Sequence, residues 1–410
     1  MTEPTVVIRP STTEDVAAAV RRAKQESLPV TVVSGGHGPW SHGSSPGLRI
    51  ELSELNSVDV DGTTVRVGGG AVWGDVAATL AGHGLAISSG DTATVGVGGL
   101  TLGGGVGWMV RSWGLAADQL IGVEVVTADG DVIEASADEN PDLFWALRGG
   151  GGNFGVVTRF DFAAHRLDGI AFAETRFADP ASVLRAVRDL LTDAPRELTV
   201  TYMDVPPMDP SAPAGASLSA VWAGADAERL RAVLEPITRL DGVEADITTP
   251  AYRDILMEPP VPAEGEEQVP PGFVGGNGLY ARLDDDLIDR LLAFRAAYPA
   301  SVLFLRSLGG AFGDVTQEAT AFPAREATWF VMAGAFDIPG LVDDDTRAEI
   351  LADWAVIERN RIAEYSNFSP TERPEAVAGM FAPAARERLR EIKRTWDPEN
   401  LFRRNHNIVP

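Results

Sequence analysis

Residues 96–108 of this 410-residue chain read GVGGLTLGGGVGW and contain seven glycines. A flexible linker is one interpretation of so much glycine, but linkers avoid the valine, leucine and tryptophan that are interspersed here. Backbone amides without a neighbouring Cβ can approach an anionic ligand such as a pyrophosphate without help from a lysine. The run therefore favours a loop that cradles a ligand.

A second glycine-rich run, RGGGGNFGVV, covers residues 148–157. It contains a formal G-x-G-x-x-G at Gly150, Gly152 and Gly155. A β-branched strand follows it instead of a helix, so the context of a doubly wound dinucleotide-binding fold is missing. This match alone is weak evidence for a nucleotide site.

A third run, VVSGGHGPW at residues 32–40, ends a strand-like segment with two glycines, His37 and another glycine. This histidine could be a contact, a metal ligand or an attachment point for a ligand. Metal binding is disfavoured because the sequence has no HxH, no HExxH and no adjacent carboxylate cluster. We expect His42, His83 and His165 to be surface or structural residues, whereas His37 lies at the mouth of a presumed phosphate loop.

Composition excludes several classes of protein. The absence of cysteine rules out disulfides, thiolate metal sites and thiol nucleophiles. Only two lysines are present and no P-loop motif, which disfavours a Schiff-base mechanism. A net charge of −25 argues against nucleic-acid partners, and no apolar run is long enough for a membrane span. The first residues lack a basic-then-apolar leader, so we expect a cytoplasmic protein; the alternative is a twin-arginine leader removed before this chain begins.

Helix-like and strand-like segments interleave with short turns in the first part of the chain. A helix is predicted over 12–27, where Thr12 and Thr13 precede an acidic first turn. A hairpin is predicted over 121–136, with Asp129-Gly130 at its turn. Because several strand pairs read as antiparallel, the pattern indicates an α+β fold and not a doubly wound sheet.

From about Arg166 the chain alternates longer helices with strands. Residues 257–272 interrupt this pattern with MEPPVPAEGEEQVPPG, which is too rich in proline and glutamate to form a core element. This segment is a candidate lid. Its acidic part, residues 263–268, would suit a cationic ligand, although surface charge is poor evidence about a pocket.

Several motifs in fixed order closely resemble the berberine bridge enzyme-like family, part of the vanillyl alcohol oxidase superfamily of FAD-linked oxidases. The resemblance is strong over about residues 5–165 and 362–410. The segments that carry it are 10–38, 90–120, 142–158 and 395–410, with weaker support from 307–315 and 320–325.

The resemblance implies a two-lobed PCMH-type FAD-binding domain together with an α/β substrate-binding domain that contains an antiparallel sheet. Residues 1–165 would form the first part of the FAD-binding domain and residues 166–361 the substrate-binding domain. Residues 362–410 would return to the FAD-binding domain.

The resemblance also implies that the loop around His37 holds the pyrophosphate, and that His37 bonds covalently to the flavin 8α carbon. Many relatives carry a second tether, a cysteine, where this chain has Thr92, so a single attachment is expected here. Val95 occupies the position thought to gate oxygen, and valine there resembles the oxidases more than the dehydrogenases. The residues expected to contact FAD are Ser34, Gly35, Gly36, His37, Gly38, Gly90, Asp91, Thr92, Thr94, Val95, Gly96, Gly99, Leu100, Gly104, Gly105, Gly107, Val157, Asn367, Asn405 and Asn407.

Tyr365 in YSNF matches the family's YxN segment and is the first candidate for the catalytic base or orienting donor. A buried structural tyrosine is the alternative interpretation. Tyr202 and Tyr280, on predicted strands of the substrate-binding domain, are the next candidates.

The resulting hypothesis is an FAD-dependent oxidase that oxidises an alcohol or amine carbon of a small molecule and reduces O₂ to H₂O₂. Sugars, alkaloids, nicotine derivatives and other natural products are all family substrates, and the sequence does not choose among them. A dehydrogenase with another electron acceptor, or a flavin-binding protein without turnover, remain the alternatives.

Overall fold

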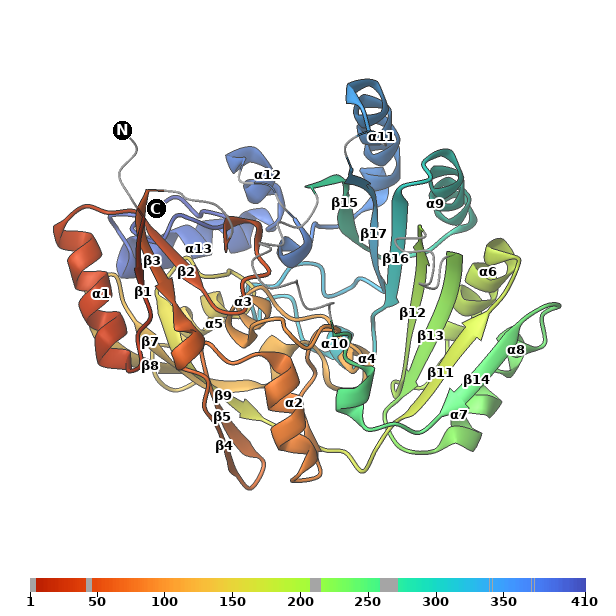
Figure 1. The fold of residues 1–410 in the computed structure, drawn as a ribbon, viewed down its shortest axis with the longest axis horizontal. Coiled ribbons are helices and arrows are strands. Elements are labelled where there is room, and N and C mark those ends of the chain that lie inside the picture. Colours follow the sequence, from red (N-terminus) through yellow and green to blue (C-terminus); the bar gives the residue numbers. More distant parts are fainter. Residues whose placement is uncertain are drawn as a thin grey trace.

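The computed structural model describes residues 5–41, 46–206, 215–258, 272–338, 340, 342–369, 371 and 373–410. The fold has an N-terminal lobe with two main sheets and a second lobe built on one large sheet, and C-terminal helices return to the first lobe (Figure 1). His42 and the acidic stretch 263–268 lie outside the described residues.

The first lobe begins with a three-stranded parallel sheet in the order β1-β3-β2. Helix α1 (Thr13–Gln25) packs on it, with Thr12 and Asp15 forming the reciprocal cap that the sequence predicts. Its apolar stripe, which includes Val16 and Val20, is fully buried. The strands are β1 (Thr5–Ile8), β2 (Val30–Val33) and β3 (Gly47–Glu51).

The second sheet of this lobe is five-stranded and antiparallel, in the order β4-β5-β9-β7-β8. The predicted hairpin is confirmed: β7 and β8 pair around Asp129-Gly130, and Gly130 takes the φ of +79° that the tight turn requires. The strands are β4 (Val58–Asp61), β5 (Thr64–Gly68), β7 (Leu120–Val126), β8 (Val132–Ser136) and β9 (Val156–Ala163); β6 (Leu85–Ala86) and β10 (His165–Arg166) form a separate pair.

The second lobe is built on a seven-stranded sheet in the order β14-β11-β13-β12-β16-β17-β15, with every neighbouring pair antiparallel. Helices α6 (Pro180–Leu191), α9 (Asp285–Ala297) and α11 (Asp344–Ile357) cover its outer face (Figure 1). The strands are β11 (Ala171–Arg176), β12 (Leu198–Val205), β13 (Gly215–Trp222), β14 (Glu244–Thr248), β15 (Gly272–Tyr280), β16 (Ser301–Ser307) and β17 (Trp329–Asp337).

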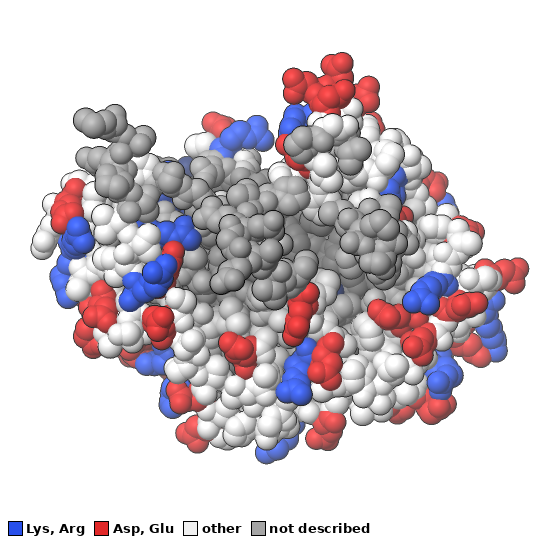
Figure 2. Space-filling model, in the orientation of Figure 1, with Lys and Arg blue, Asp and Glu red and all other residues white. Residues whose placement is uncertain are grey.

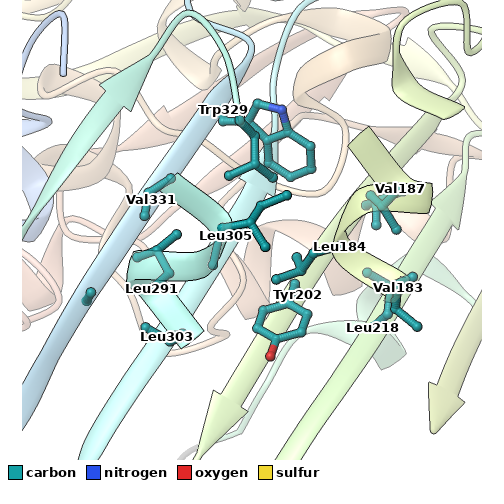
Figure 3. Close-up of a cluster of buried hydrophobic side chains, with 14 of the residues drawn as sticks. Val183, Leu184, Val187, Tyr202, Leu218, Leu291, Leu303, Leu305, Trp329 and Val331 are labelled. Carbon is teal, nitrogen blue, oxygen red and sulfur yellow. The ribbon is translucent and has the colours of Figure 1, made fainter. Parts of the chain in front are cut away.

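Side-chain alternation gives this sheet two different faces. Leu303 and Leu305 of β16 and Val331 of β17 point into a core shared with the helices (Figure 3). The residues that alternate with them along each strand, such as Phe304 and Met332, point to the opposite face, toward the first lobe. The α+β architecture expected from the sequence is confirmed.

The C-terminal segment joins the first lobe through α13 (Pro383–Trp396), which packs against α5 (Pro141–Leu147). In the described part of the chain, no helix is long and apolar enough to cross a membrane. Acidic and basic side chains are interspersed over the face drawn in Figure 2. The remaining helices are α2 (Trp73–Ala81), α3 (Val97–Leu102), α4 (Val110–Trp113), α7 (Ala227–Val233), α8 (Glu235–Thr238), α10 (Ala311–Asp314) and α12 (Pro374–Gly379).

Candidate active site

A cavity of about 730 Å³ lies where the glycine-rich loops, the inner face of the large sheet and the C-terminal segment meet. This is within the usual size range of ligand pockets. Of the sequence-predicted site residues, the cavity brings together Ser34, Gly35, Gly36, His37, Gly38, Gly90, Asp91, Thr92, Val95, Gly96, Gly99, Leu100, Val157, Tyr365, Asn367 and Asn405.

The loop after β2 forms one wall of the cavity. Gly35 and Gly96 touch backbone to backbone, since a Cβ on Gly35 would lie 2.2 Å from the Gly96 nitrogen. Ser34 donates a hydrogen bond to the Gly69 carbonyl at 2.8 Å, which fixes the base of the loop. Glycine at these two positions therefore allows two loops to meet, in addition to leaving backbone amides near the cavity.

His37 is an exposed residue at the edge of this loop. Its Nε2 lies 2.9 Å from Oγ1 of Thr94. Thr94 is not among the lining residues, so its contribution to the site is this contact with the imidazole. A hydrogen bond between the hydroxyl and one ring nitrogen fixes the orientation of the imidazole, and the tautomer decides which of the two groups donates.

Three predicted glycines lie behind the cavity wall. A Cβ on Gly107 would lie 1.3 Å from the Ser89 carbonyl oxygen, and one on Gly104 would overlap the ring of Phe322. Gly105 instead donates its backbone N–H to the hydroxyl of Tyr365 at 3.0 Å. These glycines support the site through packing and hydrogen bonding, and do not line the cavity.

The C-terminal segment holds residues 149–153 of the second glycine-rich run. The fully buried ammonium of Lys393 donates to the Asn153 carbonyl and to Asp397, both at 2.7 Å. The Asn153 side chain accepts from the Ile408 N–H at 2.9 Å. Together these bonds place the chain's last residues beside the loop.

Two asparagines of this tail were predicted to contact a cofactor. Asn405 donates through Nδ2 to the Gly152 carbonyl at 3.1 Å. Its buried Oδ1 finds no hydrogen-bond partner among the residues that the structure describes, and the same holds for Oδ1 of Asn407. Asn405 lines the cavity and Asn407 does not. A buried acceptor at a cavity wall needs a donor, which a bound ligand can supply.

Tyr365 follows α11 in the chain and lines the cavity. Its hydroxyl accepts hydrogen bonds from the backbone N–H groups of Gly105 and Val106, at 3.0 and 3.3 Å, and from Nδ2 of Asn367 at 2.9 Å. Burial raises the pKa of Tyr365, while these three donors act in the opposite direction. Three converging donors stabilise negative charge on the oxygen, as a proton acceptor requires.

The structure does not bring the other two candidate tyrosines to the cavity. Tyr202 lies on the helix-covered face of β12, in the core shown in Figure 3, and its hydroxyl is 3.5 Å from Asp204. Tyr280 lies in the same core and donates to the Ile357 carbonyl at 3.3 Å. The sequence-based expectation for both is therefore corrected: strand alternation turns their rings away from the site.

Sequence reasoning also missed a charged residue beside the cavity. Arg306, on the inner face of β16, forms an ion pair with Asp91 and donates to Oγ1 of Thr201 at 2.9 and 2.8 Å. An arginine within an otherwise apolar strand was the signal, but it could not be matched to Asp91, 215 residues earlier in the chain.

The residues present fit FAD, the cofactor implied by the resemblance. The cavity has closely approaching glycine loops at one end and a buried, unpartnered acceptor on Asn405. In the described ranges, no group of three or more His, Asp or Glu side chains could hold a metal ion. No lysine is among the described lining residues, so the backbone amides of the loops, together with the side chain of Arg404, would be the groups available to bind the phosphates.

Comparison with known proteins agrees with this geometry. A family model for an FAD binding domain matches residues 4–136, and one for berberine and berberine-like proteins matches residues 364–409. The (R)-6-hydroxynicotine oxidase of Paenarthrobacter nicotinovorans is 30% identical over 437 residues, covering 99% of this chain and 91% of that protein.

Solved structures give the same result. The 6-hydroxy-D-nicotine oxidase of Arthrobacter nicotinovorans superposes with a TM-score of 0.83 at 26% identity, covering 100% of this chain and 93% of that one. The glucooligosaccharide oxidase of Acremonium strictum, whose FAD is both cysteinyl- and histidyl-linked, gives 0.84 at 26% identity, with 99% and 92% covered. This chain therefore belongs to the berberine bridge enzyme-like family of FAD-linked oxidases.

Proposed function

We propose that the protein is an FAD-dependent oxidase that carries its flavin on a single bond to His37 and oxidises an alcohol or amine carbon of a small molecule. The observation that supports this most directly is that His37 and Tyr365 line the same cavity. His37 lies on the glycine-rich loop after β2, and Tyr365 lies at the inner face of the large sheet. The relatives named above are oxidases of a nicotine derivative and of an oligosaccharide.

Bound FAD would supply a two-electron acceptor: the substrate loses a hydride and a proton to become a carbonyl or imine, and O₂ then takes up two electrons and two protons to give H₂O₂. The loops around Gly35, Gly96 and Gly151 would hold the cofactor, and Asn405 would offer it a hydrogen-bond acceptor. We further propose residues 1–165 and 362–410 as the cofactor-binding domain, with residues 166–361 above it as the substrate-binding domain.

Thr94 would prepare His37 for the covalent bond. If Nε2 carries the proton and donates to Oγ1 of Thr94, the lone pair of the ring is on Nδ1, which is then the nucleophile toward the 8α carbon. That addition would leave two extra electrons on the cofactor, and these would pass to O₂. A second link through sulfur is impossible here, because Thr92 lines the cavity and the whole chain has no cysteine.

Tyr365 would take the substrate proton. Its Oη is positioned by Gly105, Val106 and Asn367, so a substrate hydroxyl or amine bound against it would meet an oxygen on which these three donors stabilise the phenolate form. Val95, at the cavity wall, would leave space for oxygen.

The test begins with the purified protein, whose yellow colour should stay with the polypeptide after acid precipitation. His37→Ala should release the flavin, while His83→Ala, which alters an exposed histidine away from the cavity, should retain it. Substrates are then screened anaerobically for flavin bleaching, and H₂O₂ is measured when air is admitted. Bleaching without fast reoxidation by air would favour a dehydrogenase, and no bleaching with any substrate would favour a flavin carrier.

A further inference from the structure

The inner face of the large sheet forms an apolar wall of the cavity. Met203, Phe304 and Met332 are direct neighbours on three adjacent strands, because Met203 pairs with Phe304 and Phe304 with Met332. All six described side chains that this sheet contributes to the cavity lining are apolar: Met203, Val205, Val302, Phe304, Met332 and Phe336. We call this set the Met–Phe wall.

Two exposed apolar side chains extend the wall toward the C-terminal segment and the loop after β14. Phe368 is 41% exposed and stacks on Phe304, with ring centroids 6.3 Å apart. Met257 is 48% exposed, and both residues line the cavity. Large apolar side chains that remain exposed inside a cavity are typical of a ligand-binding surface.

The carboxylate beside the Met–Phe wall is already paired with an arginine. Asp91 carries the one carboxylate among the described lining residues. Its partner Arg306 is 1% exposed and is held by Thr201 and by the ring of Trp108, 4.3 Å from the guanidinium carbon. Among the described lining residues, a protonated amine would therefore find no unpaired carboxylate.

The wall is equally unsuited to a carbohydrate. Sugar hydroxyls that are buried need hydrogen-bond partners, and aliphatic, thioether and phenyl groups supply none. Methionine and phenylalanine instead suit flat, apolar ligands, since thioethers are flexible and make favourable contacts with aromatic rings.

We infer that the substrate is a neutral alcohol with an aromatic or otherwise apolar body, and not an oligosaccharide or a cationic amine. This inference rests on the proposed function. The body lies on the Met–Phe wall and the carbinol points toward Oη of Tyr365. The carbinol carbon loses a hydride and its hydroxyl a proton, so the alcohol becomes an aldehyde or ketone while the flavin, and then O₂, takes the two electrons.

The test compares three probes on the holoenzyme: cinnamyl alcohol, cinnamylamine as its cationic isostere, and cellobiose. Anaerobic flavin reduction is followed by rapid mixing. Binding is measured separately by calorimetric titration with cinnamyl methyl ether, which has no hydroxyl proton to lose. We expect the ether to bind, and the alcohol to reduce the flavin with a second-order rate constant at least on the order of tenfold above either competitor.

A matched pair of variants tests whether the Met–Phe wall binds the apolar body of the ligand. Met332→Gln keeps the length of the side chain but adds an amide to the wall, and should weaken ether binding on the order of tenfold. Met332→Leu should keep the preference for the alcohol over cellobiose. Flavin content and melting temperature identify any variant that fails to fold, in which case the same comparison is made with Met203→Gln and Met203→Leu.

The outcomes separate this inference from the proposed function. Faster reduction by cellobiose or cinnamylamine, equal binding to the Gln and Leu variants, or no binding of the ether would overturn the inference while leaving the oxidase proposal intact. Ether binding without flavin reduction by any of the three probes would support the apolar site and count against the oxidase.

Discussion

Arg306 of the large sheet and Asp91 of the first lobe form a buried ion pair across the cavity-side boundary between the two lobes. The arginine comes from β16 and the aspartate from the loop that also carries Thr92 and Val95. The pair therefore connects the substrate-facing sheet to the loop beside the proposed flavin.

Removing one member of this ion pair should lower the free energy of unfolding. Arg306→Met leaves the Asp91 carboxylate without its partner in a largely buried setting, and we expect a loss of about 3–5 kcal/mol in the free energy of unfolding. Denaturant unfolding measures it. Arg185→Met, which breaks exposed pairs with Asp285 and Asp289, is the control and should cost about 0–1 kcal/mol. Partial recovery in the double variant Arg306→Met/Asp91→Asn is expected, and additive losses would argue against the pairing.

Thr94 should control covalent attachment of the flavin. Thr94→Val keeps the shape of the side chain but removes the hydroxyl 2.9 Å from Nε2 of His37, so a smaller fraction of the flavin should become covalently bound. Flavin fluorescence of the denatured polypeptide measures that fraction. Thr94→Ser, which keeps a hydroxyl, should remain near the parent value. A similar loss in both variants would contradict the proposal that the Thr94 hydroxyl prepares His37 for attachment.

Val95 should influence the reaction with oxygen. Val95→Leu adds one methylene to a half-buried position in the cavity wall, and we expect slower reoxidation of the reduced enzyme by O₂. Stopped-flow traces give the rate, and reduction of an artificial dye in the same variant is the internal control. If reoxidation is unchanged, access to the flavin is governed by another residue.

His406 should make stability depend on pH. Burial lowers its pKa to about 4, although the contact of Nε2 with the Ser369 carbonyl at 3.1 Å opposes this shift. Because the unfolded chain binds the proton near pH 6.5 and the folded chain does not, stability is lost as pH falls from about 6.5 to 4, by about 3 kcal/mol in total. Unfolding free energies of the parent and of His406→Gln over this range should diverge by that amount; parallel curves would contradict the assignment.

Local patterns in the sequence predicted much of this molecule. The cap at Thr12, the hairpin turn at Gly130 and the loop around His37 each depend on a few neighbouring residues, and the structure has all three features in place. Family resemblance predicted Tyr365 in the same way, through the short segment YSNF, and this residue does line the cavity.

Long-range relationships could not be predicted in this way. Most of β12 and all of β16 are buried on both faces, so their sequences have no polar–apolar alternation to reveal which side chains face the helices. Tyr202 was therefore assigned to the wrong face. Arg306 was missed because its partner Asp91 comes from a distant segment, and a buried charge has no local signature without its partner. The contact of Lys393 with the Asn153 carbonyl is equally distant in sequence, although its ion-pair partner Asp397 is only four residues away.

Tyr365 provides the sharpest test of the proposed chemistry. Tyr365→Phe should slow anaerobic flavin reduction by about 10²–10⁴-fold, because positioned proton transfer contributes on that scale. Tyr280→Phe is the matched control: it removes a buried hydroxyl from the same lobe, bonded to the Ile357 carbonyl, without changing the cavity.

The pH profile distinguishes a base from a structural tyrosine. Burial raises the pKa of Tyr365, so the fraction of phenolate, and with it the rate of flavin reduction, should still be rising as pH increases toward 10. Asn367→Leu removes one of the three donors to Oη and should shift that rise to higher pH, whereas the Phe variant should give a flat profile. A structural role would give lower thermal stability in Tyr365→Phe with an unchanged rate and profile, and this result would exclude Tyr365 as the base.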